Sequence, residues 1–104
     1  MGYLSDLSDR WKAVDAFCRD RIGTGLEDAA VDELSSFVEY LETERREWEM
    51  TKARVAQLQG EPAVASFARG LDGAIARNII RVGDIETAAR LLAIELDINL
   101  TADL

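Results

Sequence analysis

Residues 39–50 read EYLETERREWEM, and this stretch lies in the middle of the segment that decides the predicted fold. It holds five glutamates, two arginines and one tryptophan, and it has neither glycine nor proline. Such a composition favours a helix, because unbranched side chains lose little conformational freedom there. The single tryptophan among the charges raises the question of which side of the helix it occupies.

The helix that contains this stretch is predicted to be the longest in the chain. Thr24 and Glu27 form the T-x-x-E pattern of a capping box, which predicts a helix start at that point. No glycine or proline occurs between Glu27 and Gly60, so the helix can run unbroken to Gln59, a length of roughly 50 Å. A break at Ser35–Ser36 is the alternative, because a second capping box begins there.

Apolar residues recur along this helix every three or four positions, which places them on one side. The heptad positions hold Leu34, Leu41, Trp48 and Val55, and the companion positions hold Ala30, Phe37 and Leu58. Glu44 and Thr51 interrupt two of the companion positions. Trp48 therefore belongs to the apolar side despite its acidic neighbours, and the pattern is typical of a helical bundle or a coiled coil.

The opposite side of the same helix is acidic. Its carboxylates are Asp28, Asp32, Glu39, Glu42 and Glu49. Charge is also divided along the chain, since residues 27–49 hold nine acids and two bases, whereas residues 50–83 hold five bases and two acids. Acids near the start of a helix and bases near its end complement the helix dipole. Part of this division is therefore explained by helix stability alone.

Turn signals on both sides of the long helix predict shorter helices. The first helix is capped by Ser5 or Asp6 and runs to about Ile22, before a GTG turn. The third follows the GEP turn at residues 60–62 and runs to about Val82. Its inward residues are predicted to be Val64, Phe67, Leu71, Ile75 and Ile79.

Gly83 is predicted to end the third helix, and Asp84 to cap a fourth with the sequence IETAARLLAIELD. Within the third helix, Gly70 and Gly73 predict close packing of a neighbouring helix, because glycine costs about 1 kcal/mol relative to alanine in a helix interior. The final residues, INLTADL, are either a docked extended end or a frayed extension of the fourth helix.

These elements fit a single domain over residues 1–104, an all-α bundle of about four helices with one long second helix. The first and fourth helices are too short to cover the apolar side of the second along its whole length. Either the third helix covers the remainder as an antiparallel neighbour, or a second copy of the chain does. Heptad spacing suits both arrangements, so the question stays open here.

The composition argues against an enzyme, a metalloprotein or a nucleic-acid-binding protein. The chain has no histidine, and Cys18 lies on the apolar side of its helix, as a structural cysteine would. The net charge of −8 opposes binding to phosphates and to anionic membranes. No catalytic, cofactor-binding or metal-binding residue is predicted. The opening MGYLSD does not resemble a signal peptide and no run has the length of a membrane span, so a cytoplasmic protein is expected.

The sequence predicts a non-catalytic protein–protein interaction module that binds another protein or self-associates through its long helix as a homo-oligomer, most simply a homodimer. The partner-binding residues on the apolar side are predicted to be Phe37, Leu41, Trp48 and Val55. The alternative is a small acidic inhibitor that imitates nucleic acid, in the manner of anti-CRISPR proteins, and blocks a basic surface. Its binding residues would be Asp28, Asp32, Glu39, Glu42 and Glu49.

Overall fold

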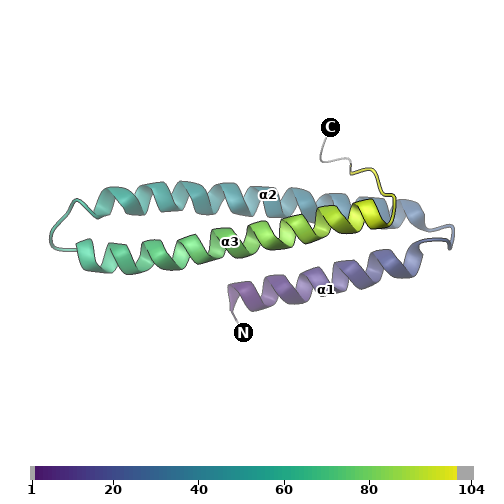
Figure 1. Ribbon diagram of the computed structural model, residues 1–104, viewed down its shortest axis with the longest axis horizontal. Coiled ribbons are helices and arrows are strands. Elements are labelled where there is room, and N and C mark those ends of the chain that lie inside the picture. The colour runs from purple at the N-terminus through teal and green to yellow at the C-terminus, as the bar shows by residue number, and fades with distance from the viewer. Residues whose placement is uncertain (1, 101–104) are drawn as a thin grey trace.

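The computed structural model describes residues 2–100, and these residues form three helices and no strand (Figure 1). Helix α1 spans Tyr3–Arg21, α2 spans Glu27–Leu58 and α3 spans Ala65–Glu95. The predicted all-α class and the long second helix are confirmed, but the predicted number of four helices is wrong.

The error lies at Gly83, where the third and fourth predicted helices are one continuous helix, α3. Gly83 does not take the left-handed conformation of a helix end; the glycines with positive φ are Gly23 (81°) and Gly25 (86°), in the turn before α2. Val82 and Ile85, on either side of Gly83, are both buried. Their packing keeps the backbone helical where the isolated sequence signals a stop.

Helix α2 is unbroken at Ser35–Ser36, so the alternative with a break is wrong. Its start differs from the predicted capping box by a few residues. The Gly23 N–H donates to Glu27 Oε2 at 2.8 Å, and the Leu26 N–H donates to Thr24 Oγ1 at 3.3 Å. Thr24 and Glu27 therefore stabilise the turn before the helix, and neither is the N-cap residue, which is Leu26.

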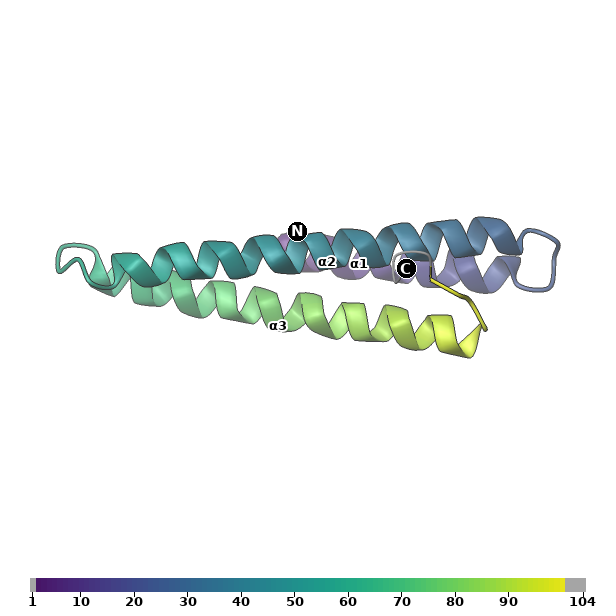
Figure 2. The same cartoon turned by 90° about the horizontal axis from the view of Figure 1, so that it is seen from above.

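Helices α2 and α3 lie antiparallel and side by side along their whole lengths, whereas α1 lies beside only one half of this pair (Figures 1 and 2). Helix α2 has 32 residues against 19 in α1, and the difference corresponds to about 20 Å of helix. The molecule is accordingly elongated, with extents of 60 × 31 × 16 Å. One end is a three-helix bundle and the other is a two-helix hairpin.

The buried core follows this division. The larger cluster lies where all three helices meet, and its largest fully buried side chains are Phe37, Leu34, Leu41, Val38, Val82 and Cys18. The smaller cluster lies in the hairpin end and consists of Val55, Ala68 and Ile75. Trp48 packs against both clusters and so marks the boundary between the two ends.

The segment after α3 is docked as far as residue 100. Asp97 takes the left-handed conformation (φ 56°), its N–H donates to the Ile94 carbonyl, and the Ile98 N–H donates to the Ala93 carbonyl at 2.8 Å. This is the Schellman arrangement that ends many helices. Ile98 is buried and Leu100 packs on the larger cluster, so the docked alternative is the one observed for these residues. Residues 101–104 lie outside the described part of the chain.

Gly70 and Gly73 are not sites of close helix packing. A Cβ added to Gly70 would meet nothing within 4 Å, and one added to Gly73 would meet only the Arg77 guanidinium at 3.7 Å. Among the described residues, no other helix approaches these two glycines closely, so the predicted close packing is wrong.

Candidate interaction surface

The predicted apolar face of α2 is mostly covered by the chain itself. Phe37 and Leu41 are fully buried, and the Phe37 ring stacks on Trp11 of α1 with centroids 6.0 Å apart. Val55 is 6% exposed and packs in the smaller cluster with residues of α3. The antiparallel neighbour α3 thus covers the far end of the face, and these three side chains have little free surface for a partner.

Trp48 is the member of the predicted set that stays partly exposed. Its ring meets the ring of Tyr3, the first residue of α1, edge to face at 5.3 Å. A shallow hollow lined by Glu44, Glu47, Trp48 and Thr51 opens at this place, and a second hollow follows along α2 as far as Arg54. The end of α1 therefore leaves Trp48 at the edge of an uncovered surface.

Glu44, which interrupts the heptad pattern, lies where α1 begins. It accepts hydrogen bonds at Oε1 from the Tyr3 hydroxyl at 2.8 Å and from the Tyr40 hydroxyl at 3.2 Å. Burial of the phenol, with a smaller contribution from Glu44, raises the pKa of Tyr3 to about 12. Burial and the same carboxylate also raise the pKa of Tyr40. The polar residue in the apolar face thus fixes the start of α1 against α2.

Raising the pH should loosen this contact. Because the pKa of Tyr3 is higher in the folded chain than its ordinary value near 10, its contribution to stability is complete below about pH 10 and is lost as the pH rises towards 12. We expect the melting temperature to fall across this window, and to fall less in Tyr3→Phe, which has no proton to lose there. Tyrosinate absorbance of Tyr40→Phe reports Tyr3 alone, and titration of the folded variant near pH 10 would contradict the assignment.

The predicted acidic residues of α2 divide into two groups. Asp28, Asp32 and Glu39 are exposed and form no ion pair with the described residues. Glu42 instead pairs with Arg90 of α3 and with Arg46 at 3.5 Å.

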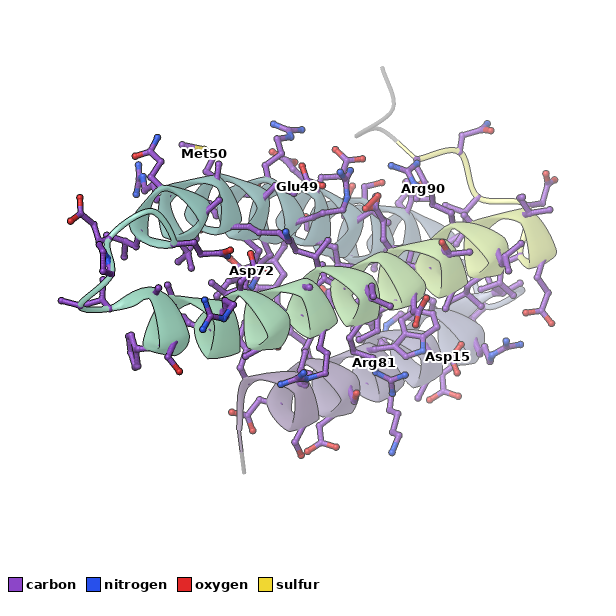
Figure 3. All side chains as sticks on the ribbon, turned by 60° about the vertical axis from the view of Figure 1, so that its left-hand side comes forward. Asp15, Glu49, Met50, Asp72, Arg81 and Arg90 are labelled. Atoms are coloured by element: carbon purple, nitrogen blue, oxygen red, sulfur yellow. The ribbon has the colours of Figure 1, made fainter. Side chains whose placement is uncertain are left out.

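Glu49 also has a partner, because it pairs with Arg45 at 3.4 Å, and Arg45 in turn donates to Glu86 of α3 at 3.0 Å. Glu86 is only 9% exposed, and Arg90 reaches it at 3.8 Å (Glu49 and Arg90 are labelled in Figure 3). This network joins α2 to α3, and it was not predicted because the glutamates of α2 were placed on the side of the helix opposite its apolar residues. Its signal was the inward heptad position of Glu86 in α3.

Large apolar side chains are exposed at the hairpin end. Phe67 is 71% exposed and Leu71 is 37% exposed, although both were predicted to point inward. On a helical wheel of about 100° per residue these two positions of α3 share the side on which Ile85 and Leu92 are buried further along, at the end where α1 lies. They occupy the positions that α1 would cover if it were longer. Leu58 is exposed beside the turn of the hairpin, and so is Val64, for which the predicted inward position is also wrong.

Three exposed arginines lie on the two helices of the hairpin. Arg54 on α2 and Arg77 and Arg81 on α3 are exposed and form no ion pair within residues 2–100 (Figure 3 labels Arg81). Lys52, by contrast, pairs with Asp72 at 3.2 Å across the α2–α3 contact. We call the surface formed by Trp48, Leu58, Val64, Phe67 and Leu71 the open end. The exposed acid Glu61 lies in the turn between Leu58 and Val64, whereas Arg81 lies beside α1 (Figure 3).

Outside the open end, the remaining features to consider are the single cysteine, clusters of metal-binding side chains and helices long enough to span a membrane. Cys18 is fully buried, its thiol donates to the Ala30 carbonyl at 3.5 Å, and burial raises its pKa, so it stays a neutral thiol. Among the described residues no group of three or more acidic, cysteine or histidine side chains could hold a metal ion. In the same part of the chain, no helix combines the length and hydropathy that crossing a membrane requires.

Comparison with known proteins adds no relative to this picture: no family model, no curated protein and no solved structure matches the chain.

Proposed function

We propose that the protein is a non-catalytic protein-interaction module that binds its partner, another protein or a second copy, through the open end. The observation that supports this function is the exposure of Phe67, Leu71, Leu58 and Val64 on the one half of the hairpin that α1 does not cover. Contiguous exposed apolar side chains are typical of interaction sites, and aromatic side chains dominate binding energies at such sites. Trp48 lies at the edge of this surface and Val55 is buried beneath it, whereas Phe37 and Leu41 are buried in the larger cluster, away from it.

Burial of this surface by a partner would lower the free energy. Leaving a large apolar side chain in water forgoes about 1.5–3 kcal/mol relative to burying it. Phe67 is 71% exposed and stacks on no other aromatic ring within the described residues. A partner that buries it gains this free energy without disturbing the core.

Site-specific photo-cross-linking tests the proposal. A benzophenone amino acid at position 67 should give a discrete cross-linked product in cells, either with a second copy or with another protein. The same amino acid at Ile94, which is 76% exposed at the opposite end of α3, should not. Equal yields from the two positions would contradict binding through the open end, and mass measured over a dilution series separates a second copy from another partner.

The acidic inhibitor remains a second candidate, because Asp28, Asp32 and Glu39 are exposed without ion pairs among the described residues. In that case a cross-linker at Asp28 should give the product, and Asp32→Lys with Glu39→Lys should abolish it. Binding would also weaken steeply with ionic strength. Glu42 is no longer a suitable site for this test, since its reversal would break the contact with Arg90.

A further inference from the structure

We propose that the first turn of α1, residues 3–6, is a lid over Trp48 that opens while the rest of α1 stays in place. Opening of the lid uncovers the part of Trp48 that Tyr3 covers, and it enlarges the open end on that side. The opening is a property of the free chain, and only its effect on binding rests on the proposed interaction function.

Tyr3 is the residue that closes the lid. It is the first residue of α1, and its ring meets the Trp48 ring with centroids 5.3 Å apart and an interplanar angle of 68°. Edge-to-face pairs of this kind are favourable. The Tyr3 hydroxyl also donates to Glu44 Oε1 at 2.8 Å, which holds the phenol beside the indole. These contacts favour the closed lid, which is the state in the structure.

The rest of the turn is held less firmly. Ser5 and Asp6 are exposed and Leu4 is half-buried, whereas Leu7, at the start of the next turn, is 4% exposed. The N-cap residue, Gly2, makes no side-chain hydrogen bond to the turn. Helix ends fray, and a local opening costs less free energy than global unfolding. The burial of Leu7 therefore places the hinge of the lid just before this residue.

The turn lies where the cover of the α2–α3 pair stops. Helix α1 begins at Tyr3, so within the described residues no helix lies beside the turn on the hairpin side (Figures 1 and 2). The hollow lined by Glu44, Glu47, Trp48 and Thr51 lies at this point on α2. Because Tyr3 contacts both Glu44 and Trp48, opening of the lid extends this hollow towards α1.

A lid at this place regulates the open end. When the lid is closed, Trp48 is partly covered at the edge of the surface. When it is open, a larger part of the indole joins the exposed apolar side chains, and tryptophan is enriched among the residues that dominate binding energies. A partner that contacts the uncovered indole binds the open state alone, so its apparent affinity is reduced in proportion to the open fraction.

Two substitutions of the exposed Ser5 test the opening without changing Trp48 or Tyr3. Glycine is less favourable than alanine in a helix, so the opening constant should be about two- to fivefold larger in Ser5→Gly than in Ser5→Ala. Hydrogen exchange of the amides of residues 7–9, followed by NMR on the full chain, measures this constant. In an α-helix these amides donate to the carbonyls of residues 3–5, so they exchange when the first turn opens.

Ala13→Gly is the matched control for the hinge. Ala13 is exposed in the middle of α1, and glycine there weakens the helix beyond Leu7. If the first turn opens alone, this variant leaves the exchange of amides 7–9 unchanged. Equal increases in Ser5→Gly and Ala13→Gly would show that α1 opens as a whole, and the lid would be overturned.

Fluorescence tests the cover of Trp48 itself. Trp11→Phe leaves Trp48 as the single tryptophan, and Tyr3→Ala in this background removes the ring that covers it. We expect stronger quenching of Trp48 by acrylamide and emission at longer wavelength. Tyr3→Phe keeps the ring and loses the hydrogen bond to Glu44, so its change should be smaller. Unchanged quenching in Tyr3→Ala would overturn the assignment of Tyr3 as the cover.

The effect on binding is measured with the cross-linker at position 67. The yield of its product should be higher in Ser5→Gly than in Ser5→Ala. Equal yields would overturn the role of the lid in binding and leave the proposed interaction function in place. That function is judged separately, by cross-linking at position 67 against position 94. If it fails there, amide exchange and fluorescence still decide whether the lid opens.

Discussion

Replacing Phe37 with alanine is expected to lower the free energy of unfolding by about 3–5 kcal/mol. The side chain is 1% exposed and stacks on Trp11 at an interplanar angle of 8°, and the Arg10 guanidinium lies 5.5 Å from its ring centre. Alanine would leave a cavity between α1 and α2 that the surrounding helices can close only in part. A domain of this size has a total free energy of unfolding of about 5–15 kcal/mol, so the expected loss is a large fraction of the total.

Phe67→Ala is the matched control for this prediction. The residue type and the substitution are the same, but Phe67 is 71% exposed, so the free energy of unfolding should change by less than about 0.5 kcal/mol. Urea denaturation followed by circular dichroism measures both variants. Equal losses in the two would show that Phe67 is part of the core and would remove the open end as a binding surface.

Replacing Gly70, Gly73 and Gly83 together with alanine is expected to raise the free energy of unfolding by about 2–3 kcal/mol. All three lie inside α3, where alanine is favoured over glycine by almost 1 kcal/mol per residue. An added Cβ meets nothing within 4 Å at Gly70 and Gly83, and only a flexible guanidinium at Gly73. The gain should therefore appear without a steric cost.

Gly25→Ala controls for the substitution itself. Gly25 has a φ of 86°, a conformation that an L-residue adopts with strain, so this variant should lose about 1 kcal/mol although nothing lies within 4 Å of the added Cβ. Thermal unfolding of the triple variant and of each single variant checks the sum. A loss at Gly83→Ala alone would indicate a helix break at that position, as the sequence predicts and the structure does not show.

Local sequence signals were reliable where one mechanism dominated. The absence of glycine and proline from residues 26–59, together with the heptad pattern, predicted the long α2 but left a break at Ser35–Ser36 as the alternative, which the structure excludes. At Gly83 and Asp84 two mechanisms competed, because the stop and cap signals opposed the burial of Val82 and Ile85. The free energy of packing depends on the neighbouring helices, which a single sequence does not provide.

The binding surface was harder to predict than the fold. The length mismatch between the first and second helices was visible in the sequence, and it led to the expectation of uncovered apolar residues on α2. In the structure the exposed apolar residues of the hairpin end lie mainly on α3, at Phe67 and Leu71. Helix α3 covers Val55, and its own apolar side faces the region that α1 is too short to reach. Periodicity identifies an apolar side, but it does not tell which neighbour reaches it.

The short α1 also means that the two halves of the molecule need not open together. The hairpin half is held by a small cluster of three buried residues, whereas the other half shares a core contributed by all three helices. Amide hydrogens near the turn at residues 60–64 can therefore exchange through local opening, whereas those around Leu34 and Val82 exchange only through global unfolding. A protein that docks on the hairpin would suppress that opening and would slow the exchange of the amide hydrogens near the turn.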